Sequence, residues 1–304
     1  MKSLTGEIPR DREVASADVH RPGLALTGFV EAFRQNSLQI LGNTEVRYVN
    51  GLPKDERREA FRNVFRFDVP VLVLSAGLEP PFGLIEAAHE FGVPVLSANS
   101  QTVDVVRELT HLLEDKLAPT TTVHGSLVDV YGVGLIITGR SAIGKSETAL
   151  DLVERGHRLV ADDAVTVQRK ADAVLIGRGN DLLRHRMEIR GIGIIDVQSL
   201  FGIRAIRAQK RVELEIHLEE WDSGADYERH GLEDRTTEML GVELSQVVVP
   251  IFPGKNITVI CETIALRYLV KAYGYDPAQH FNENLLELMR RKANLAVLAR
   301  DDLE

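Results

Sequence analysis

The chain has 304 residues, of which 44% are hydrophobic and 27% charged, a balance typical of folded globular proteins and not of disordered chains. Its formal net charge of −9 argues against nucleic acid as the main partner, because a phosphate backbone requires a basic face, and it favours a basic protein partner. The N-terminus is too charged for a signal peptide and no stretch reaches about 18 apolar residues, so we expect a cytoplasmic protein.

Strand-like and helix-like runs alternate in the first third of the chain. The apolar runs predict strands over 37–41, 70–75 and 94–97, and the helical runs cover 55–66, 81–91 and 102–117. This alternation predicts a small parallel sheet with helices on its faces, an N-terminal α/β domain over residues 1–118. The domain contains no phosphate-loop motif or nucleophile signature. The loop after Ser75 is either a ligand loop at a strand end or a plain connection, and we favour the plain connection.

The second predicted domain covers residues 119–304, and the stretch 118–122, with one proline and three threonines, is predicted to link the two. Short strands are expected over 128–131 and 134–138 around Gly132, and another over 158–161. Residues 164–168 and 173–176 predict a hairpin, and the clean alternation of 211–218 predicts one half-buried strand. Helical periodicity returns over 262–272 and 284–299.

The stretch 139–147, GRSAIGKSE, matches the phosphate-loop pattern G-x-x-x-x-G-K-[ST] between an apolar strand and an amphipathic helix. The glycines let successive N–H groups point into one concavity that holds a polyphosphate. Lys145 supplies a positive charge to the β- and γ-phosphates, and the Ser146 hydroxyl supplies a ligand to Mg²⁺. The predicted nucleotide-binding residues are Gly139, Arg140, Ser141, Ala142, Ile143, Gly144, Lys145, Ser146 and Glu147.

Two adjacent acids, Asp162 and Asp163, close the strand 158–161 beyond the phosphate loop. A nucleotide enzyme keeps a carboxylate at this position for its metal ion, and a second acid can face the attacking hydroxyl. The other interpretation is a turn in which both aspartates only accept hydrogen bonds. We favour the functional interpretation because the two acids stand where a nucleotide enzyme requires a carboxylate for its metal ion.

Further polar residues have less specific signals. Glu188 lies in an apolar segment and is either bound to a cation or paired with Arg190 on a strand surface. His124 is a base, a phosphate contact or a structural histidine, and the residues alone favour the structural role. The loop 250–256 is a linker or a lid that brings Lys255 to a phosphate. The single cysteine, Cys261, is predicted to fill the core.

Taken together, these motifs resemble the HPr kinase/phosphorylase family along nearly the whole chain. The matching segments are HRPGLALTGF (20–29), HGSLVDVYGVG (124–134), the phosphate loop, RGHRLVADDAV (155–165), MEIRGIGIIDVQSLFG (187–202) and PIFPGKN (250–256). The resemblance implies a bifunctional enzyme that uses ATP to phosphorylate a serine of the phosphocarrier protein HPr. It also implies removal of that phosphate by inorganic phosphate, with release of pyrophosphate.

The resemblance also implies roles for individual residues. Asp162 would be the base that accepts the serine proton and, in reverse, the acid that returns it. Ser146, Glu188 and Asp163 would bind magnesium, His124 would assist near the phosphates, and Arg229 would serve the phosphorylase direction. The catalytic set is therefore Asp162, His124, Lys145 and Arg229. Family members are typically homohexamers assembled through the C-terminal domain.

Three positions depart from the family pattern. Ala142 stands where glycine is usual, and Phe252 and Lys255 stand where arginines are common. Lysine cannot form the two parallel hydrogen bonds that arginine gives a phosphate, so the balance between the two directions is the least supported inference. The loop motif itself predicts binding of a nucleotide and a metal ion but does not indicate which molecule accepts the phosphoryl group. A kinase of a small metabolite and a non-catalytic nucleotide sensor therefore remain alternatives.

Overall fold

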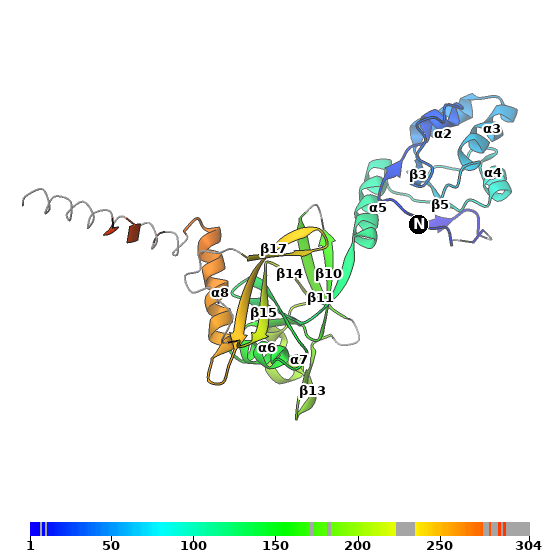
Figure 1. Ribbon diagram of the computed structural model, residues 1–304. Helices are drawn as coiled ribbons and strands as arrows, with labels where there is room; N and C mark the ends of the chain where they lie inside the picture. Colours follow the sequence, from blue (N-terminus) through cyan, green and yellow to red (C-terminus); the bar gives the residue numbers. More distant parts are fainter. Residues whose placement is uncertain are drawn as a thin grey trace, which may run out of the picture. The chain divides into compact units, whose positions relative to one another are not determined.

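The computed structural model describes residues 1–304 except 7, 10, 171–172, 181–183, 223–234, 276–279, 281–284, 287 and 290–304. The chain divides into two compact units, Met1–Ala118 and Pro119–Glu304, which are described separately (Figure 1).

The N-terminal unit is an α/β unit built on a five-stranded sheet of order β1-β5-β4-β3-β2. Strands β2 to β5 run parallel, and β1 pairs antiparallel with β5 at the edge. The strands are β1 (Lys2–Ser3), β2 (Val19–His20), β3 (Leu38–Leu41), β4 (Leu72–Leu74) and β5 (Val95–Ser97). The helices are α1 (Gly23–Leu26), α2 (Asn43–Gly51), α3 (Lys54–Phe65), α4 (Leu84–Phe91) and α5 (Thr102–Leu117).

Helices cover both faces of this sheet, as the alternation of strands and helices predicts. One core joins buried residues of α1 to α4, such as Phe61 and Leu84, to Leu72 and Leu74 of β4. A second core joins α5 to the opposite face of β3 and β4. Helix α2 was not predicted, because most of its side chains are polar and it begins almost directly after β3. Helix α4 ends at the left-handed Gly92, where the sequence predicts a cap.

The C-terminal unit combines several sheets with the helices that follow the phosphate loop and precede the C-terminus. Its strands are β6 (Thr120–His124), β7 (Ser126–Val130), β8 (Val133–Gly139), β9 (Arg158–Ala161), β10 (Ala164–Lys170), β11 (Val174–Gly179), β12 (Arg186–Ile189), β13 (Gly193–Asp196), β14 (Gln209–Arg211), β15 (Leu214–Glu220), β16 (Arg235–Met239) and β17 (Val242–Ile251). Its helices are α6 (Lys145–Glu154), α7 (Val197–Phe201), the 3₁₀ turn η1 (Ile203–Ala205) and α8 (Ile257–Ala272).

The main sheet of this unit has six strands in the order β16-β17-β15-β8-β7-β9. Strands β8, β15 and β17 run parallel, whereas β8 and β9 each pair antiparallel with β7. Strands β8, β9, β15 and β17 therefore share one direction, and their carboxyl ends meet at one edge. Ligands bind at such edges in open α/β sheets.

Different layers cover the two faces of the main sheet (Figure 1). One face packs against α6 and α8 through a core that contains Leu135, Ile137, Leu152 and the buried Cys261. The other face packs against the antiparallel sheet β14-β11-β10-β6 through a core that contains Leu127, Ile136 and Val165. Cys261 fills the core as predicted, and burial raises the pKa of its thiol to about 12. Helix α6 ends before Gly156, whose positive φ is typical of a glycine just beyond a helix C-terminus.

Three predictions about this unit need correction or lie outside the described residues. Residues 120–122 of the predicted linker belong to β6, which pairs with β10, because the alternating threonines suit a half-buried strand. The predicted strand 211–218 is two strands, β14 and β15, which belong to different sheets. The predicted helix 284–299 lies almost entirely outside the described residues.

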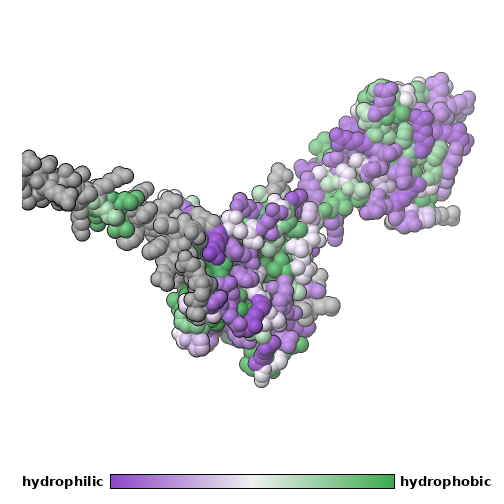
Figure 2. Space-filling model, in the orientation of Figure 1, coloured by the Kyte–Doolittle hydropathy of each residue, from purple (hydrophilic) through white to green (hydrophobic). Residues whose placement is uncertain are grey.

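The surfaces of both units are mainly polar in the view of Figure 2, with smaller hydrophobic areas between purple residues. Among the described helices, none combines the length and the apolar character that crossing a membrane requires.

Candidate active site

The phosphate loop connects β8 to α6 at the carboxyl edge of the main sheet. Gly139 and Gly144 have positive φ values of 134° and 106°, a region that glycine enters without steric cost. Ala142 also has a positive φ, 68°, so the loop keeps a left-handed turn at the position where glycine is usual in the resembled family. Helix α6 starts directly after this loop, and the N–H groups of its first turn have no acceptor within the helix, which is why helix N-termini bind phosphate oxygens.

Lys145 is the first residue of α6, and its side chain is held inside the loop. Its Nζ donates hydrogen bonds to the carbonyls of Gly139 at 3.1 Å and Arg140 at 2.9 Å. The residue is 6% exposed, so the ammonium is shielded from water by the loop that it serves. A polyphosphate in the concavity would meet this charge together with the loop amides.

Asp162, which directly follows β9, lies against the start of α6. The hydroxyls of Ser146 and Ser126 both donate to its Oδ1, at 3.1 and 2.5 Å. The other oxygen, Oδ2, is buried and has no hydrogen-bond partner among the described residues. Burial raises the pKa of Asp162, and the two serine hydroxyls oppose that shift. A buried carboxylate oxygen without a partner is costly unless a cation or a proton donor uses it.

Asp163 and His124 form a second polar pair at the same edge. Asp163 has a positive φ of 66°, and its carbonyl accepts a hydrogen bond from the Gly125 amide at 3.1 Å. His124 Nδ1 lies 3.0 Å from that carbonyl and 3.2 Å from Asp163 Oδ1. Both side chains are more than half exposed. The fold thus brings His124, Asp162 and Asp163 to the edge at which Ser146 lies, although His124 precedes Ser146 by 22 residues.

The remaining predicted site residues are less closely tied to this cluster. Glu188 lies exposed on β12, opposite Ile194 of β13, and no described contact joins it to the phosphate loop or to Arg190. The proposed surface pair Glu188–Arg190 is therefore not formed. Strand β12 packs its other face, Met187 and Ile189, into the core beside α6. Arg229 lies outside the described residues.

Oxygen atoms at this edge suit a hard divalent cation. Asp162 Oδ2 lacks a partner and Ser146 Oγ lies on the same carboxylate, and both are ligand types that Mg²⁺ prefers. No cluster of three or more His, Cys, Asp or Glu side chains occurs in the described part of the chain. The residues fit an ion that takes most of its ligands from water and phosphates, as Mg²⁺ does in nucleotide sites.

The sequence did not single out Ser126, although it donates the shortest hydrogen bond to Asp162. Ser126 begins β7, two residues after His124, and a serine at a strand start carries no signal by itself. The same edge holds an ion pair between Arg140 and Glu220 and an edge-to-face pair of Trp221 and Phe252 with centroids 5.5 Å apart. These residues lie at or just beyond the carboxyl ends of β8, β15 and β17, so the sheet order brings them together.

Lys255 lies in the turn between β17 and α8, so the stretch 250–256 does not link two units. Its Nζ donates to the Pro250 carbonyl at 2.9 Å and lies 5.2 Å from the centre of the Phe252 ring. Burial lowers the pKa of Lys255. The alternative prediction, a lid that brings Lys255 to a phosphate, stays a prediction.

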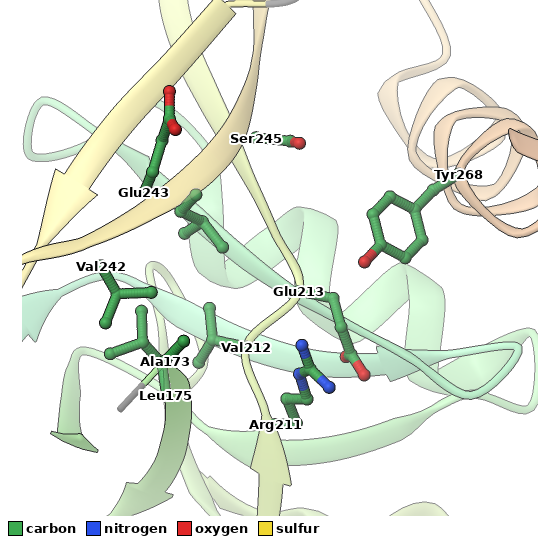
Figure 3. A pocket seen from close by; sticks show the side chains of 10 residues that line it. Ala173, Leu175, Arg211, Val212, Glu213, Val242, Glu243, Ser245 and Tyr268 are labelled. Carbon is green, nitrogen blue, oxygen red and sulfur yellow. The ribbon is translucent and has the colours of Figure 1, made fainter. Parts of the chain in front are cut away.

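A small pocket of about 130 Å³ lies away from this edge (Figure 3). Leu175, Val212 and Leu244 line its apolar side, and Arg211, Glu213 and Tyr268 give it a polar side. It opens beside the first residues of β15 and β17, whereas the phosphate loop follows the last residue of β8. The pocket is therefore at the opposite end of the parallel strands from the phosphate chemistry.

Comparisons with known proteins match both units. Residues 1–113 match the family model of the HPr Serine kinase N terminus, and residues 115–285 match that of the HPr Serine kinase C-terminal domain. An HPr kinase/phosphorylase of Chloroherpeton thalassium is 47% identical over 295 residues, covering 97% of this chain and 87% of the relative. One of Shouchella clausii is 43% identical over 291 residues, covering 96% and 94%. The structure of the Hpr(Ser) kinase/phosphatase from Coxiella burnetii is 36% identical and covers 54% of this chain and 99% of that chain, with a TM-score of 0.47.

Proposed function

The chain belongs to the HPr kinase/phosphorylase family, and from this premise we propose how its residues carry out the two reactions. As a member it is an enzyme, a bifunctional regulator of the serine phosphorylation of HPr that uses ATP and phosphate. The observation that carries the residue assignment is the free Oδ2 of Asp162, beside the first turn of the phosphate-loop helix.

In the kinase direction, the loop amides and Lys145 hold the β- and γ-phosphates of ATP. The serine oxygen of HPr forms a bond to the γ-phosphorus while the bond to the bridging oxygen of ADP breaks, and the serine proton passes to Asp162 Oδ2. Asp162 suits this role because its Oδ1 is fixed by two serine hydroxyls and its Oδ2 is unused. Ser126 and Ser146 therefore orient the base.

In the phosphorylase direction, inorganic phosphate attacks the phosphorus of phosphoserine, and the protonated Asp162 returns a proton to the leaving serine oxygen. The products are HPr and pyrophosphate. Burial raises the pKa of Asp162, which makes the carboxyl a better proton carrier near neutral pH than an ordinary aspartate. A single site serves both directions, because each direction needs bound phosphates and one group that exchanges a proton.

We propose Mg²⁺ as the cation, held by Ser146 with Asp163 and Glu188, which leaves Asp162 Oδ2 for the serine proton. Bound there, the ion would neutralise charge on the transferred phosphoryl group. His124 is proposed to contact phosphate from its place beside Asp163. Arg229 is proposed for the phosphorylase direction, and residues 119–304 for assembly into a homohexamer; both proposals rest on the family resemblance alone.

The direct test incubates the full chain with γ-labelled ATP, Mg²⁺ and purified HPr. We expect acid-stable phosphoserine on HPr, and release of pyrophosphate when phosphorylated HPr meets inorganic phosphate. Label in a small molecule of the assay mixture would instead indicate a metabolite kinase. Label that stays in ATP, with ATP bound, would indicate a nucleotide sensor without turnover.

A further inference from the structure

A row of four polar side chains crosses the main sheet beside the phosphate loop. Gln246 of β17 lies opposite Glu215 of β15, and His217 of β15 lies opposite Thr138 of β8. Gln246 Nε2 donates to Glu215 Oε2 at 3.1 Å, and Thr138 Oγ1 donates to Glu215 Oε1 at 2.5 Å. His217 Nδ1 lies 3.0 Å from the same threonine oxygen. The four side chains therefore form one continuous hydrogen-bonded chain across three parallel strands.

The two central residues of the row are buried, whereas His217 and Gln246 are partly exposed, so the hydrogen bond between the two central residues matters most. Glu215 and Thr138 are 7% and 8% exposed. A hydroxyl has one proton, and since Thr138 gives it to the carboxylate, His217 must donate from Nδ1 to the threonine oxygen. Removing the hydroxyl would leave both a buried carboxylate oxygen and an imidazole N–H without their partner. A sheet that needed only packing would carry apolar side chains here, because a buried carboxylate is expensive.

The row includes Thr138, the residue that immediately precedes the phosphate loop. Thr138 is followed by Gly139, whose carbonyl accepts the hydrogen bond of Lys145. On its other side Gly139 is pressed against β15, since a Cβ built there would lie 2.4 Å from the Leu218 carbonyl oxygen. The first peptide of the loop is thus confined between the backbone of β15 and a threonine whose side chain is fixed by Glu215.

We propose that Thr138 and Glu215 are positioning residues for phosphoryl transfer: their hydrogen bond fixes Gly139, and through its carbonyl Lys145, at the geometry that grips the polyphosphate. Gln246 and His217 hold the two ends of the row. The inference rests on the proposed use of the loop for ATP, and none of these four residues belongs to the site predicted from the sequence.

The test compares the full-length variants Thr138→Val and Thr138→Ser. Valine has the shape of threonine without its hydroxyl, whereas serine keeps the hydroxyl. We expect Thr138→Val to weaken MgATP binding by about tenfold in calorimetry and to lower kcat, with KM for HPr unchanged, because a displaced loop misplaces the phosphate ligands. Thr138→Ser should bind MgATP within about twofold of the wild type, because it retains the contact.

A second variant keeps the test decisive if valine at this position prevents folding. Glu215→Met removes the acceptor, so it should weaken MgATP binding in the same direction as Thr138→Val. If Thr138→Val and Glu215→Met act through the same hydrogen bond, their effects do not add. The double variant should then bind MgATP no more weakly than whichever single variant has the lower affinity. Wild-type binding in Thr138→Val or Glu215→Met, or equal losses in the Val and Ser variants, would overturn the proposal. A wild type that binds MgATP but leaves HPr unlabelled would refute the proposed function and leave this comparison valid.

Discussion

A buried carboxylate lies at each end of helix α6, and the two differ in their hydrogen bonding. At its start, Asp162 has one oxygen fixed by two serines and one buried oxygen without a partner among the described residues, and burial raises its pKa. At its end, Glu262 of α8 accepts two hydrogen bonds from Arg155, at 2.7 and 2.9 Å, and His157 Nε2 lies 3.0 Å from it. The hydrogen bonds of Arg155 lower the pKa of Glu262, and Glu262 is paired on both oxygens.

We propose that this difference separates a reactive carboxylate, Asp162, from a structural one, Glu262. Both acids are mostly buried, so burial alone does not identify the active carboxylate. Glu262 joins α8 to the end of α6, and both of its oxygens already have partners. Asp162 retains an acceptor oxygen that no described residue uses and that a cation, a proton or a substrate hydroxyl can satisfy. An unmet hydrogen-bonding capacity at the carboxyl edge of parallel strands therefore identifies the site better than charge or burial does.

The largest expected effect comes from Asp162→Asn, which keeps the size of the side chain and removes the proposed base. We expect the rate of HPr phosphorylation to fall by about 10²- to 10⁴-fold, the usual contribution of general acid–base catalysis, with MgATP still bound. Initial rates and calorimetry measure the two effects. The matched control is Glu262→Gln, the same acid-to-amide change at the other end of α6, which should keep its rate per folded molecule. Equal loss of rate in both variants would remove the distinction between the two acids.

Glu262→Gln should instead lower the free energy of unfolding, by about 2 kcal/mol, because glutamine keeps one acceptor oxygen but loses the other and the charge that strengthens the contacts with Arg155 and His157. Arg155 is 44% exposed and can be rehydrated, which limits the loss. Urea unfolding monitored by the single tryptophan, Trp221, measures it. A stability within about 0.5 kcal/mol of the wild type, as for an ordinary surface substitution, would show that the cluster is not structural.

The contributions of Glu262 and Asp162 to the free energy of unfolding should depend on pH with opposite signs. Glu262 has a lowered pKa in the folded chain, so its contribution is present above the ordinary glutamate pKa and is lost as pH falls through the lower folded value. Asp162 has a raised pKa, so its contribution is fully present below the ordinary aspartate pKa and is lost as pH rises through the folded value.

Thermal unfolding in the presence of a chelator, from about pH 3 to about pH 7, measures both contributions. The deficit of Glu262→Gln relative to the wild type should shrink as pH falls. Asp162→Asn should be more stable than the wild type at neutral pH, and that gain should also shrink as pH falls. A deficit of Glu262→Gln that grows toward low pH would contradict the assignment.

The smallest effect is expected from Tyr131→Phe at the Glu262 cluster. The tyrosine hydroxyl lies 3.5 Å from Glu262 Oε1, a long hydrogen bond, whereas its ring packs edge-to-face on His157 at 4.7 Å. Phenylalanine keeps the ring contact, so the free energy of unfolding should change by only a few tenths of a kcal/mol. A loss as large as that of Glu262→Gln would mean that the hydroxyl, and not Arg155, holds the carboxylate.

Local patterns in the sequence predict several of the elements that form the proposed site. The phosphate loop and the strand 158–161 that precedes Asp162 each depend on neighbouring residues, so spacing and apolar runs reveal them. Strand 158–161 and helix 102–117 match the structure residue for residue, since a run of apolar residues or a helical period defines each. The family assignment followed from the order of several such motifs.

Local sequence patterns do not reveal the order of the strands in a sheet. Ser126 meets Asp162 across 36 residues, and Arg155 meets Glu262 across 107, so no period in the sequence relates them. Residues 211–218 alternate cleanly, yet Glu215 is buried because both faces of the main sheet are covered. The sequence shows that Glu188 is an acid within an apolar segment. What its side chain contacts is not a local property, because it depends on how the hairpin β12–β13 is placed relative to a bound ligand.

The most direct test of the account measures both directions of the reaction in one preparation of Asp162→Asn. Phosphorylation of HPr by ATP and release of pyrophosphate from phosphorylated HPr are each compared with the wild type. If Asp162 exchanges the serine proton in both directions, both rates fall by a similar factor, because the same carboxyl oxygen takes the proton in one direction and returns it in the other. A variant that loses phosphorylation and keeps pyrophosphate release would contradict the assignment of Asp162 as the shared acid and base.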